Sequence, residues 1–210
     1  MSTTEASVAK KLLEISAIKV QPENPFTWAS GWKSPIYCDN RKILSYPETR
    51  TFVRDAFVKL IGEKYPDAEV IAGVATGAIA MGALVAEVLG LPFIYIRSAP
   101  KGHGLENLIE GVLHEGQKVV VVEDLISTGG SSLNAAEAVV KAAGNVLGMV
   151  AIFTYGFPHA IGNFQQAGIE LTTLSNYHAL IDTAVATGSV SDAQVATLLK
   201  WRENPAEWGK

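Results

Sequence analysis

The sequence predicts an α/β fold in which helices cover both faces of a parallel sheet, with a small N-terminal hood in front of it. The first observation is a set of short apolar runs, at residues 70–72, 92–96, 119–122, 147–153 and 169–174. The second is a pair of helical patterns, at 78–89 and 133–143, which separate some of these runs. Strands that read as unbroken apolar runs are typical of parallel sheets that are buried on both faces.

Two helices and the hood are expected before the first apolar run. Residues 2–5 have the spacing of a capping box, and apolar side chains follow them at helical spacing. Residues 18–40 are rich in proline, aromatic residues and glycine, which favours short strands and turns; we call this segment the hood. Residues 45–48 form a second capping box, with Pro47 near the start of a helix.

The segment 98–117 differs from its surroundings because it is polar, contains four glycines and has no clear period. A long loop inside a compact α/β domain is often a lid, and we place the lid at 98–112. Two last helices are expected near 177–186 and 191–200, the second with a cap at Ser191.

One domain of 210 residues is therefore expected, without internal repeats or linkers. The N-terminal helix and hood occupy 1–45, the α/β core 46–175 and the C-terminal helices 176–210. At this size folding buries roughly 70% of the surface of the unfolded chain, so no disulfide or structural metal is needed. A single cysteine, Cys38, excludes an internal disulfide and fits a reducing compartment.

The charge balance excludes several classes of partner. Seventeen Lys and Arg against 21 Asp and Glu give a net charge of −4, the wrong sign for a protein that binds nucleic acid through many phosphates. The uncharged stretch 70–86 is broken by glycines and predicts a buried strand, turn and helix rather than a membrane span. The N-terminus has no basic start or long apolar stretch, which predicts a cytoplasmic protein.

The strongest chemical signal is the segment 119–132, where an apolar strand runs into Glu123 and Asp124 and then into Ser127-Thr-Gly-Gly-Ser131. A loop of small residues that opens a helix presents backbone N–H groups and a helix dipole to a phosphate. Two acids beside a phosphate site make sense if the ligand also offers sugar hydroxyls or brings a divalent cation. The alternative is a strand that ends in a solvated acidic turn before a capped helix.

Other nucleotide and hydrolase motifs are missing from the chain. It contains no G-x-x-x-x-G-K-[ST], no G-x-G-x-x-G and no G-x-S-x-G. The P-loop, dinucleotide-binding and esterase interpretations are excluded accordingly.

Residues 119–132 resemble the phosphoribosyl-pyrophosphate (PRPP) loop of the type I phosphoribosyltransferases. Further segments resemble one branch of that family, the orotate phosphoribosyltransferases. These segments are 25–37, 73–79, 95–104, 109–111, 150–155 and 174–177. The resemblance extends from about Phe26 to Tyr177 in the order of the family, and it implies a type I phosphoribosyltransferase-like fold.

The resemblance implies transfer of the 5-phosphoribosyl group from PRPP to N1 of orotate, which gives orotidine 5′-monophosphate and pyrophosphate in pyrimidine biosynthesis. It also implies Mg²⁺ as cofactor and a homodimer whose lid is shared between subunits. We assign no residue of the chain as a metal ligand.

The same resemblance implies roles for individual residues. Lys101, His103 and Asp124 are the expected catalytic residues, and Ser127 is also expected near orotate. The loop 73–77 is expected to cradle pyrophosphate by its backbone. The expected PRPP-binding residues are Arg97, Lys101, His103, Glu123, Asp124, Leu125, Ile126, Ser127, Thr128, Gly129, Gly130 and Ser131. Bond breaking leaves positive charge on the ribose and negative charge on pyrophosphate, so catalysis by positioning and electrostatics is reasonable.

Three positions depart from some members of the family. Ala29 and Gly77 stand where those members carry lysines, and Tyr155 stands where they carry an orotate-facing arginine. The charge of the orotate carboxylate must therefore be met elsewhere, for example by backbone N–H groups in the hood. Arg41 and Cys38 are interpreted as a solvated or structural cation and a packed thiol. Two alternatives stay open: a phosphoribosyltransferase for another base such as a purine, and a non-catalytic PRPP-sensing regulator.

Overall fold

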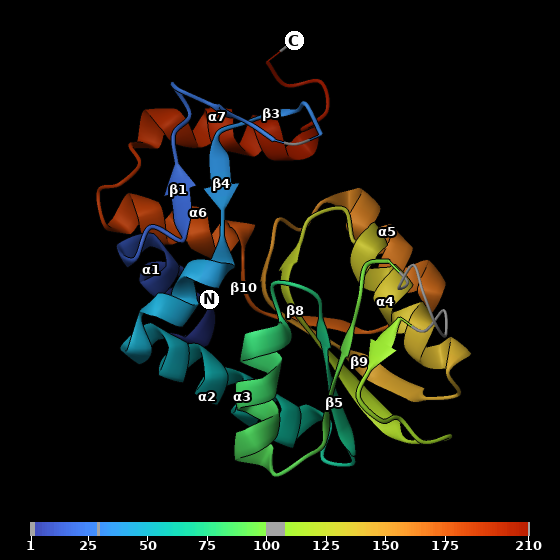
Figure 1. Ribbon diagram of the computed structural model, residues 1–210. Helices are drawn as coiled ribbons and strands as arrows, with labels where there is room; N and C mark the ends of the chain where they lie inside the picture. The colour runs from blue at the N-terminus through green and yellow to red at the C-terminus, as the bar shows by residue number, and fades with distance from the viewer. Residues whose placement is uncertain (1–2, 29, 100–107, 210) are drawn as a thin grey trace.

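A six-stranded sheet forms the centre of the computed structural model, which describes residues 3–28, 30–99 and 108–209 (Figure 1). The strand order is β10-β9-β8-β5-β6-β7. Five strands are parallel, and β7 pairs antiparallel with β6 at the edge. The strands are β5 (Val70–Val74), β6 (Phe93–Ile96), β7 (Ile109–Glu110), β8 (Lys118–Ile126), β9 (Asn145–Thr154) and β10 (Leu171–Asn176).

Helices lie on both faces of the sheet, which confirms the predicted fold class (Figure 1). One face is covered by α1 (Thr3–Glu14), α2 (Pro47–Lys64) and α3 (Ile79–Leu89). The other face is covered by α4 (Gly130–Lys141) and α5 (Pro158–Ala167). Burial on both faces explains why β5 is buried at all five positions and why residues 119–122 are fully buried valines.

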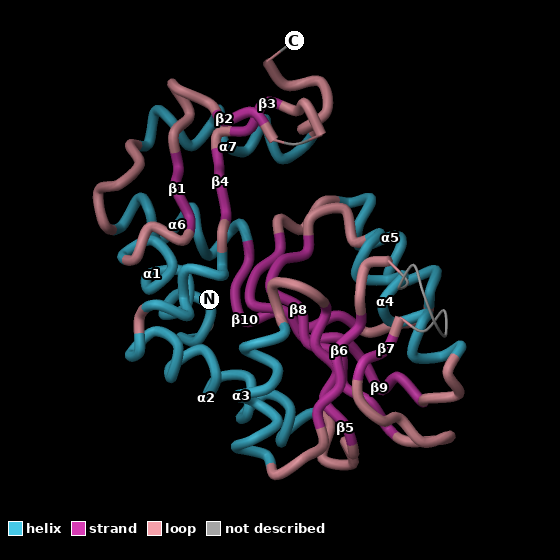
Figure 2. Tube along the Cα trace, viewed as in Figure 1, coloured by secondary structure: helices cyan, strands magenta, loops and turns pink. Residues whose placement is uncertain are grey.

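The hood consists of two small antiparallel pairs, as its proline- and aromatic-rich sequence predicts (Figure 2). One pair joins β1 (Ile18–Val20) to β4 (Ile36–Cys38), and the other joins β2 (Phe26–Thr27) to β3 (Lys33–Ser34). The helices α6 (Tyr177–Ala186) and α7 (Asp192–Glu203) lie beside them. The indole of Trp201 on α7 donates a hydrogen bond of 3.1 Å to the Lys33 carbonyl, which ties the C-terminal helix to the hood.

Strand β8 is longer than its apolar run predicts. It continues past Glu123 and Asp124 to Ile126, because β9 pairs with it up to Ile126 opposite Thr154. The acidic pair therefore lies near the carboxyl end of a strand, where Glu123 pairs with Ala151 of β9, and not in a free loop.

Two predictions about local structure are wrong and one is confirmed. Ser45 does not cap α2, because it belongs to a 3₁₀ helix, η1 (Asn40–Ser45), and Tyr46 is the N-cap without a side-chain bond. Within the predicted loop 98–117, residues 109–110 form the edge strand β7. The capping box at Ser191 is present, with Gln194 as its partner.

The helix α5 is not among the helices expected from the sequence. Its signals are at its ends: Pro158 occupies the first turn, and Gly168 ends the helix at a φ of +66°. Proline is favoured at the start of a helix and glycine just after its end.

Among the described residues, no helix is both long and apolar enough to cross a membrane. The uncharged stretch 70–86 forms β5, a turn and most of α3, as its glycines predict.

Candidate active site

A cavity of about 460 Å³ opens at the carboxyl ends of β5, β6 and β8. The chain passes from β5 to β6 on one side and later to β8 on the other, so the order of the strands reverses here. Ligands of open α/β sheets bind at such reversal points, beyond the carboxyl ends of the strands. The lining residues come from the hood, the β5–α3 loop, β6 and the β8–α4 segment: Cys38, Asp39, Arg41, Val74, Ala75, Thr76, Gly77, Ile96, Arg97, Ser98, Leu108, Glu123, Asp124, Leu125, Ser131, Asn134 and Ala135.

Glu123 and Asp124 both line this cavity but differ in their environment. Glu123 is 5% exposed, and its two carboxyl oxygens accept hydrogen bonds from the Asp124 N–H and the Ser132 hydroxyl, both at 2.8 Å. Burial raises the pKa of Glu123 to about 8, and the neighbouring Asp124 charge adds to the rise. Asp124 is half-buried, so it is the better placed of the two to meet a ligand. The ribose contacts assigned to both acids stay predictions.

The β5–α3 loop lies directly against Asp124. A Cβ atom at Gly77 would overlap the Asp124 carboxylate, so glycine is the residue that leaves this carboxylate in place. A Cβ at Gly73 would lie 2.8 Å from the Ala78 carbonyl oxygen, which also requires glycine. The peptide bond between Ala75 and Thr76 is cis. The loop therefore brings main chain, rather than side chains, to the cavity wall.

The segment after the acids makes the sharp turn that its glycines predict. Gly129 is the N-cap of α4 with a φ of +83°, and Gly130 begins the helix. The first backbone N–H groups of a helix have no partner within it, and they favour an anion. Ser131 at this end of α4 lines the cavity.

Other residues of the same segment face elsewhere. Ile126 is fully buried, and its carbonyl accepts the Tyr155 N–H at 3.2 Å. Thr128 lies in a separate hollow with Phe157 and His159. The side chains of Ile126 and Thr128 therefore do not line the cavity in which we expect PRPP.

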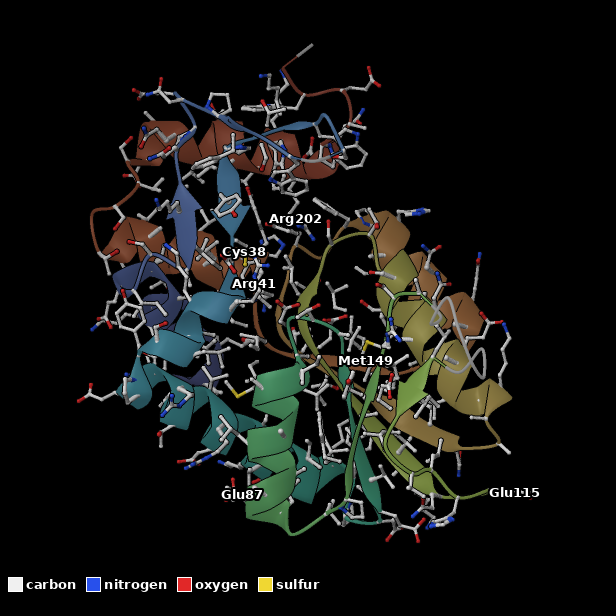
Figure 3. The ribbon with its side chains drawn as sticks, viewed as in Figure 1. Cys38, Arg41, Glu87, Glu115, Met149 and Arg202 are labelled. Carbon is white, nitrogen blue, oxygen red and sulfur yellow. The ribbon has the colours of Figure 1, made fainter. Side chains whose placement is uncertain are left out.

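Two arginines supply positive charge to the cavity. Arg97 lines it from the end of β6, and one of its guanidinium nitrogens lies 3.5 Å from Glu110 on β7. Arg41 lines it from η1 and pairs with Asp39 at 2.7 Å, a contact that lowers the pKa of Asp39. Figure 3 shows Arg41 at the end of the hood that faces the sheet. The predicted lid residues Lys101 and His103 lie outside the described residues.

A second pocket of about 310 Å³ adjoins the cavity and shares Cys38 and Leu125 with it. Its other lining residues are Thr27, Trp28, Tyr37, Ser127 and Tyr155. Among the described residues that line this second pocket, none has a charged side chain. Ser127, the residue predicted near orotate, lies here rather than in the main cavity.

Aromatic rings build the wall of this second pocket. The Tyr155 ring is 5.2 Å from Trp28 and stacks on Phe157 at 5.4 Å with an interplanar angle of 14°. Burial raises the pKa of the Tyr155 hydroxyl well above its ordinary value. Arg202 on α7 donates to the carbonyls of residues 155 and 156 at 3.0 and 2.7 Å, which holds the main chain behind the ring.

Sequence reasoning did not place Asn40, Arg41 or Asn134 in the site. Arg41 and Asn134 line the cavity, and Asn40 contacts the main chain of Asp124. The signal for Arg41 was the pair Asp39 and Arg41 directly after a hood strand. Asn134 is one turn into α4 after the glycine turn, where a side chain can face the same ligand as the turn itself.

Comparison with known proteins identifies the family. A model of the phosphoribosyl transferase domain matches residues 41–156, more than half of the chain. An orotate phosphoribosyltransferase of Phocaeicola vulgatus is 60% identical over 208 residues, which are 99% of this chain and 98% of that one.

Solved structures share the fold. Orotate phosphoribosyltransferase of Aeropyrum pernix has a TM-score of 0.75 at 26% identity, covering 88% of this chain and 99% of that one. UMP synthase of Leishmania donovani has a TM-score of 0.79 at 24% identity, covering 94% of this chain but 42% of that longer one. The second likeness shows the fold alone. With the domain match, the relative at 60% identity and the cavity at the strand reversal, the chain belongs to the orotate phosphoribosyltransferase family.

Proposed function

We propose that the chain transfers the 5-phosphoribosyl group of PRPP to N1 of orotate, releasing pyrophosphate and forming orotidine 5′-monophosphate. The observation that carries the proposal is the pairing of a charged cavity at the strand reversal with an uncharged aromatic pocket beside it. The first suits a phosphorylated sugar and the second suits a flat base. Membership of the orotate phosphoribosyltransferase family supports the choice of orotate.

In the charged cavity, Asp124 accepts hydrogen bonds from the ribose hydroxyls, and the turn at 127–131 binds the 5′-phosphate through backbone N–H groups. The bond between C1 of the ribose and the pyrophosphate oxygen breaks while N1 of the base bonds to C1, and the proton of N1 passes to the released pyrophosphate or to water. Positive charge develops on the ribose and negative charge on the leaving group. Arg97, with Lys101 and His103 of the lid, stabilises the leaving pyrophosphate.

In the uncharged pocket, the base lies between aromatic side chains with its N1 toward the shared wall at Leu125. Thr27, Ser127 and Tyr155 offer hydroxyl donors to the oxygens of the base. Stacking and neutral donors thus take the place of the arginine and lysines of other members.

Magnesium belongs to the proposal because PRPP is polyanionic. Mg²⁺ prefers oxygen ligands and is held by one or two carboxylates together with substrate phosphates and water. In the described part of the chain no three His, Cys, Asp or Glu side chains converge on one point, but Asp124 provides one carboxylate beside the expected diphosphate. When bound, the ion would neutralise charge on the pyrophosphate.

The assembly and the location are proposals of the same kind. We propose a homodimer in which the lid at 98–112 of one subunit reaches the site of the other, acting in the cytoplasm on two small molecules. Neither nucleic acid nor a membrane is part of the proposal.

The test is orotate consumption followed by ultraviolet absorbance, with PRPP and Mg²⁺ present and each omitted in turn. We expect rapid loss of orotate that needs all components. If orotate is not consumed but adenine or another purine is, orotate is the wrong substrate and the enzyme acts on a different base. Binding of PRPP by calorimetry without turnover of any base would favour a PRPP-sensing regulator.

A further inference from the structure

A buried asparagine links the hood side of the molecule to the acidic end of β8. Asn40, the first residue of η1, is 3% exposed, and its side-chain Nδ2 donates a hydrogen bond of 2.6 Å to the backbone carbonyl of Asp124. The two residues are 84 positions apart in the sequence. This contact is therefore a product of the fold and not of local chain geometry.

The orientation of the Asn40 amide is set from both sides. A backbone carbonyl can only accept, so the amide nitrogen must face Asp124. The Cys38 thiol donates to the amide oxygen with Sγ and Oδ1 3.4 Å apart. The side chain is thus fixed with its donor toward β8.

The contact is made where β8 extends beyond β5. Pairing of β5 with β8 ends at Gly73 opposite Val122, whereas pairing of β9 with β8 continues to Ile126. The edge of β8 that faced β5 has no strand beside it from residue 123 onward. Asn40 supplies a hydrogen bond to the Asp124 carbonyl here, at a residue that has no partner in the register of β8 with β9.

Three contacts consequently fix residue 124. Its N–H donates to the Glu123 carboxyl at 2.8 Å, its carbonyl accepts from Asn40, and its carboxylate lies against Gly77. The first and third come from the neighbouring residue and from the adjacent core loop. Asn40 alone among these partners brings a side chain from the N-terminal part of the molecule.

We propose that Asn40 is a positioning residue for ribosyl transfer, which sets the place of the Asp124 carboxylate by holding its main chain. The inference rests on the proposed function, because the position of Asp124 matters to the rate only if its carboxylate meets the ribose. A small displacement of a positioned group can cost about 10²-fold in rate.

The test begins with Asn40→Leu, which keeps the approximate size and removes the donor. We expect kcat/KM for PRPP to fall roughly tenfold to hundredfold at saturating orotate. Asn40→Asp, which keeps the shape but cannot donate to the carbonyl, is expected to lose at least as much.

A matched control separates positioning from stability. Ser175 is fully buried, and its hydroxyl donates to the Glu5 carbonyl at 2.9 Å, a bond between distant segments away from both pockets. Ser175→Ala should lower Tm without changing kcat/KM of the folded protein. If Asn40→Leu behaves in the same way, its role is structural and the inference fails.

A double-mutant cycle with Asp124→Asn gives the decisive result. If Asn40 acts through the Asp124 carboxylate, Asn40→Leu should cost less than about threefold in the Asp124→Asn background. An equal loss in both backgrounds overturns the inference while an active wild type leaves the proposed function intact. If the wild type turns over no base, the proposed function fails. The same four proteins are then compared by their affinity for PRPP, measured by calorimetry. Additive effects of the two substitutions on that affinity would again overturn the inference.

Discussion

The two adjoining pockets of the molecule are built on opposite chemical principles. Among the described residues, the larger cavity has five ionisable side chains in its wall, namely Asp39, Arg41, Arg97, Glu123 and Asp124. The smaller pocket has, among the residues described, hydroxyl groups, a thiol and aromatic rings, and no charge. They meet at Cys38 and Leu125, which line both.

The difference teaches how one site can handle two unlike substrates. A polyanionic sugar needs cations and helix N–H groups, whereas a flat base gains most from aromatic surface and a few directed donors. Substitutions in the two pockets are therefore expected to change different kinetic constants.

The largest expected effect is in the charged half. Asp124→Asn removes one charge and little volume, so kcat/KM should fall about 10²–10³-fold while the fold is retained. Steady-state kinetics and thermal unfolding measure the two quantities. Asp67→Asn, an exposed acid paired with Lys118 at 3.3 Å, is the control and should leave both unchanged. An unchanged rate for Asp124→Asn would remove its role at the ribose.

The next effect concerns the lid, whose residues we place at the leaving pyrophosphate. Lys101→Ala and His103→Ala should each lower kcat about 10²-fold, by analogy with other preorganised charge stabilisers. In a dimer with exchanged lids, mixing Lys101→Ala with Asp124→Asn gives one intact site per mixed dimer. Activity should then recover to roughly a quarter of the wild-type value after subunit exchange. No recovery would contradict a lid that acts across subunits.

A smaller effect is expected in the uncharged half. Tyr155→Phe removes only a hydroxyl that has no hydrogen-bond partner among the described residues. If this hydroxyl donates to the carboxylate of orotate, KM for orotate should rise about tenfold, while KM for PRPP stays unchanged. Tyr46→Phe, at an exposed tyrosine, is the control. Equal changes in KM for orotate and KM for PRPP would contradict the proposal that the two substrates occupy different pockets.

The smallest effect is on stability and comes from the buried acid. Burial raises the pKa of Glu123 to about 8, whereas in the unfolded chain it is near 4.5. The folded state therefore holds a proton that the unfolded state releases, and stability falls as pH rises from about 5 to about 8. Glu123→Gln should remove this component.

The measurement is Tm against pH for both proteins. A change of about 1 kcal/mol moves the Tm of a chain of this size by roughly 2–4 °C. The difference between the wild type and Glu123→Gln should change by at least this amount between pH 5 and pH 9, to the disadvantage of the wild type. Parallel curves would mean that Glu123 is ionised throughout.

The sequence predicts the core well because its signals are local. The valines at 119–122 indicate a strand buried on both faces, and the glycines after the acids indicate the turn into α4. The same locality explains the errors. Ser45 has the spacing of a cap, but the preceding residues form η1 and leave Tyr46 at the N-cap.

The site was predictable only in part, because its walls come from distant segments. Glu123, Asp124 and Ser131 share one segment with a recognisable pattern. Arg41 has a weaker signal, its place beside Asp39 after a hood strand, and only the tertiary fold brings it to the cavity. Asn40 is a further case, since its partner is the main chain of a residue far along the sequence.

The close fit between Gly77 and the Asp124 carboxylate constrains how this branch of the family can evolve. Any side chain at position 77 must first displace that carboxylate, because a Cβ there would overlap it. Rotating a short side chain costs the fold little, so selection would act on turnover and not on folding. The two positions are therefore expected to be epistatic: a larger residue at 77 should be tolerated only in a background in which the Asp124 carboxylate has another place.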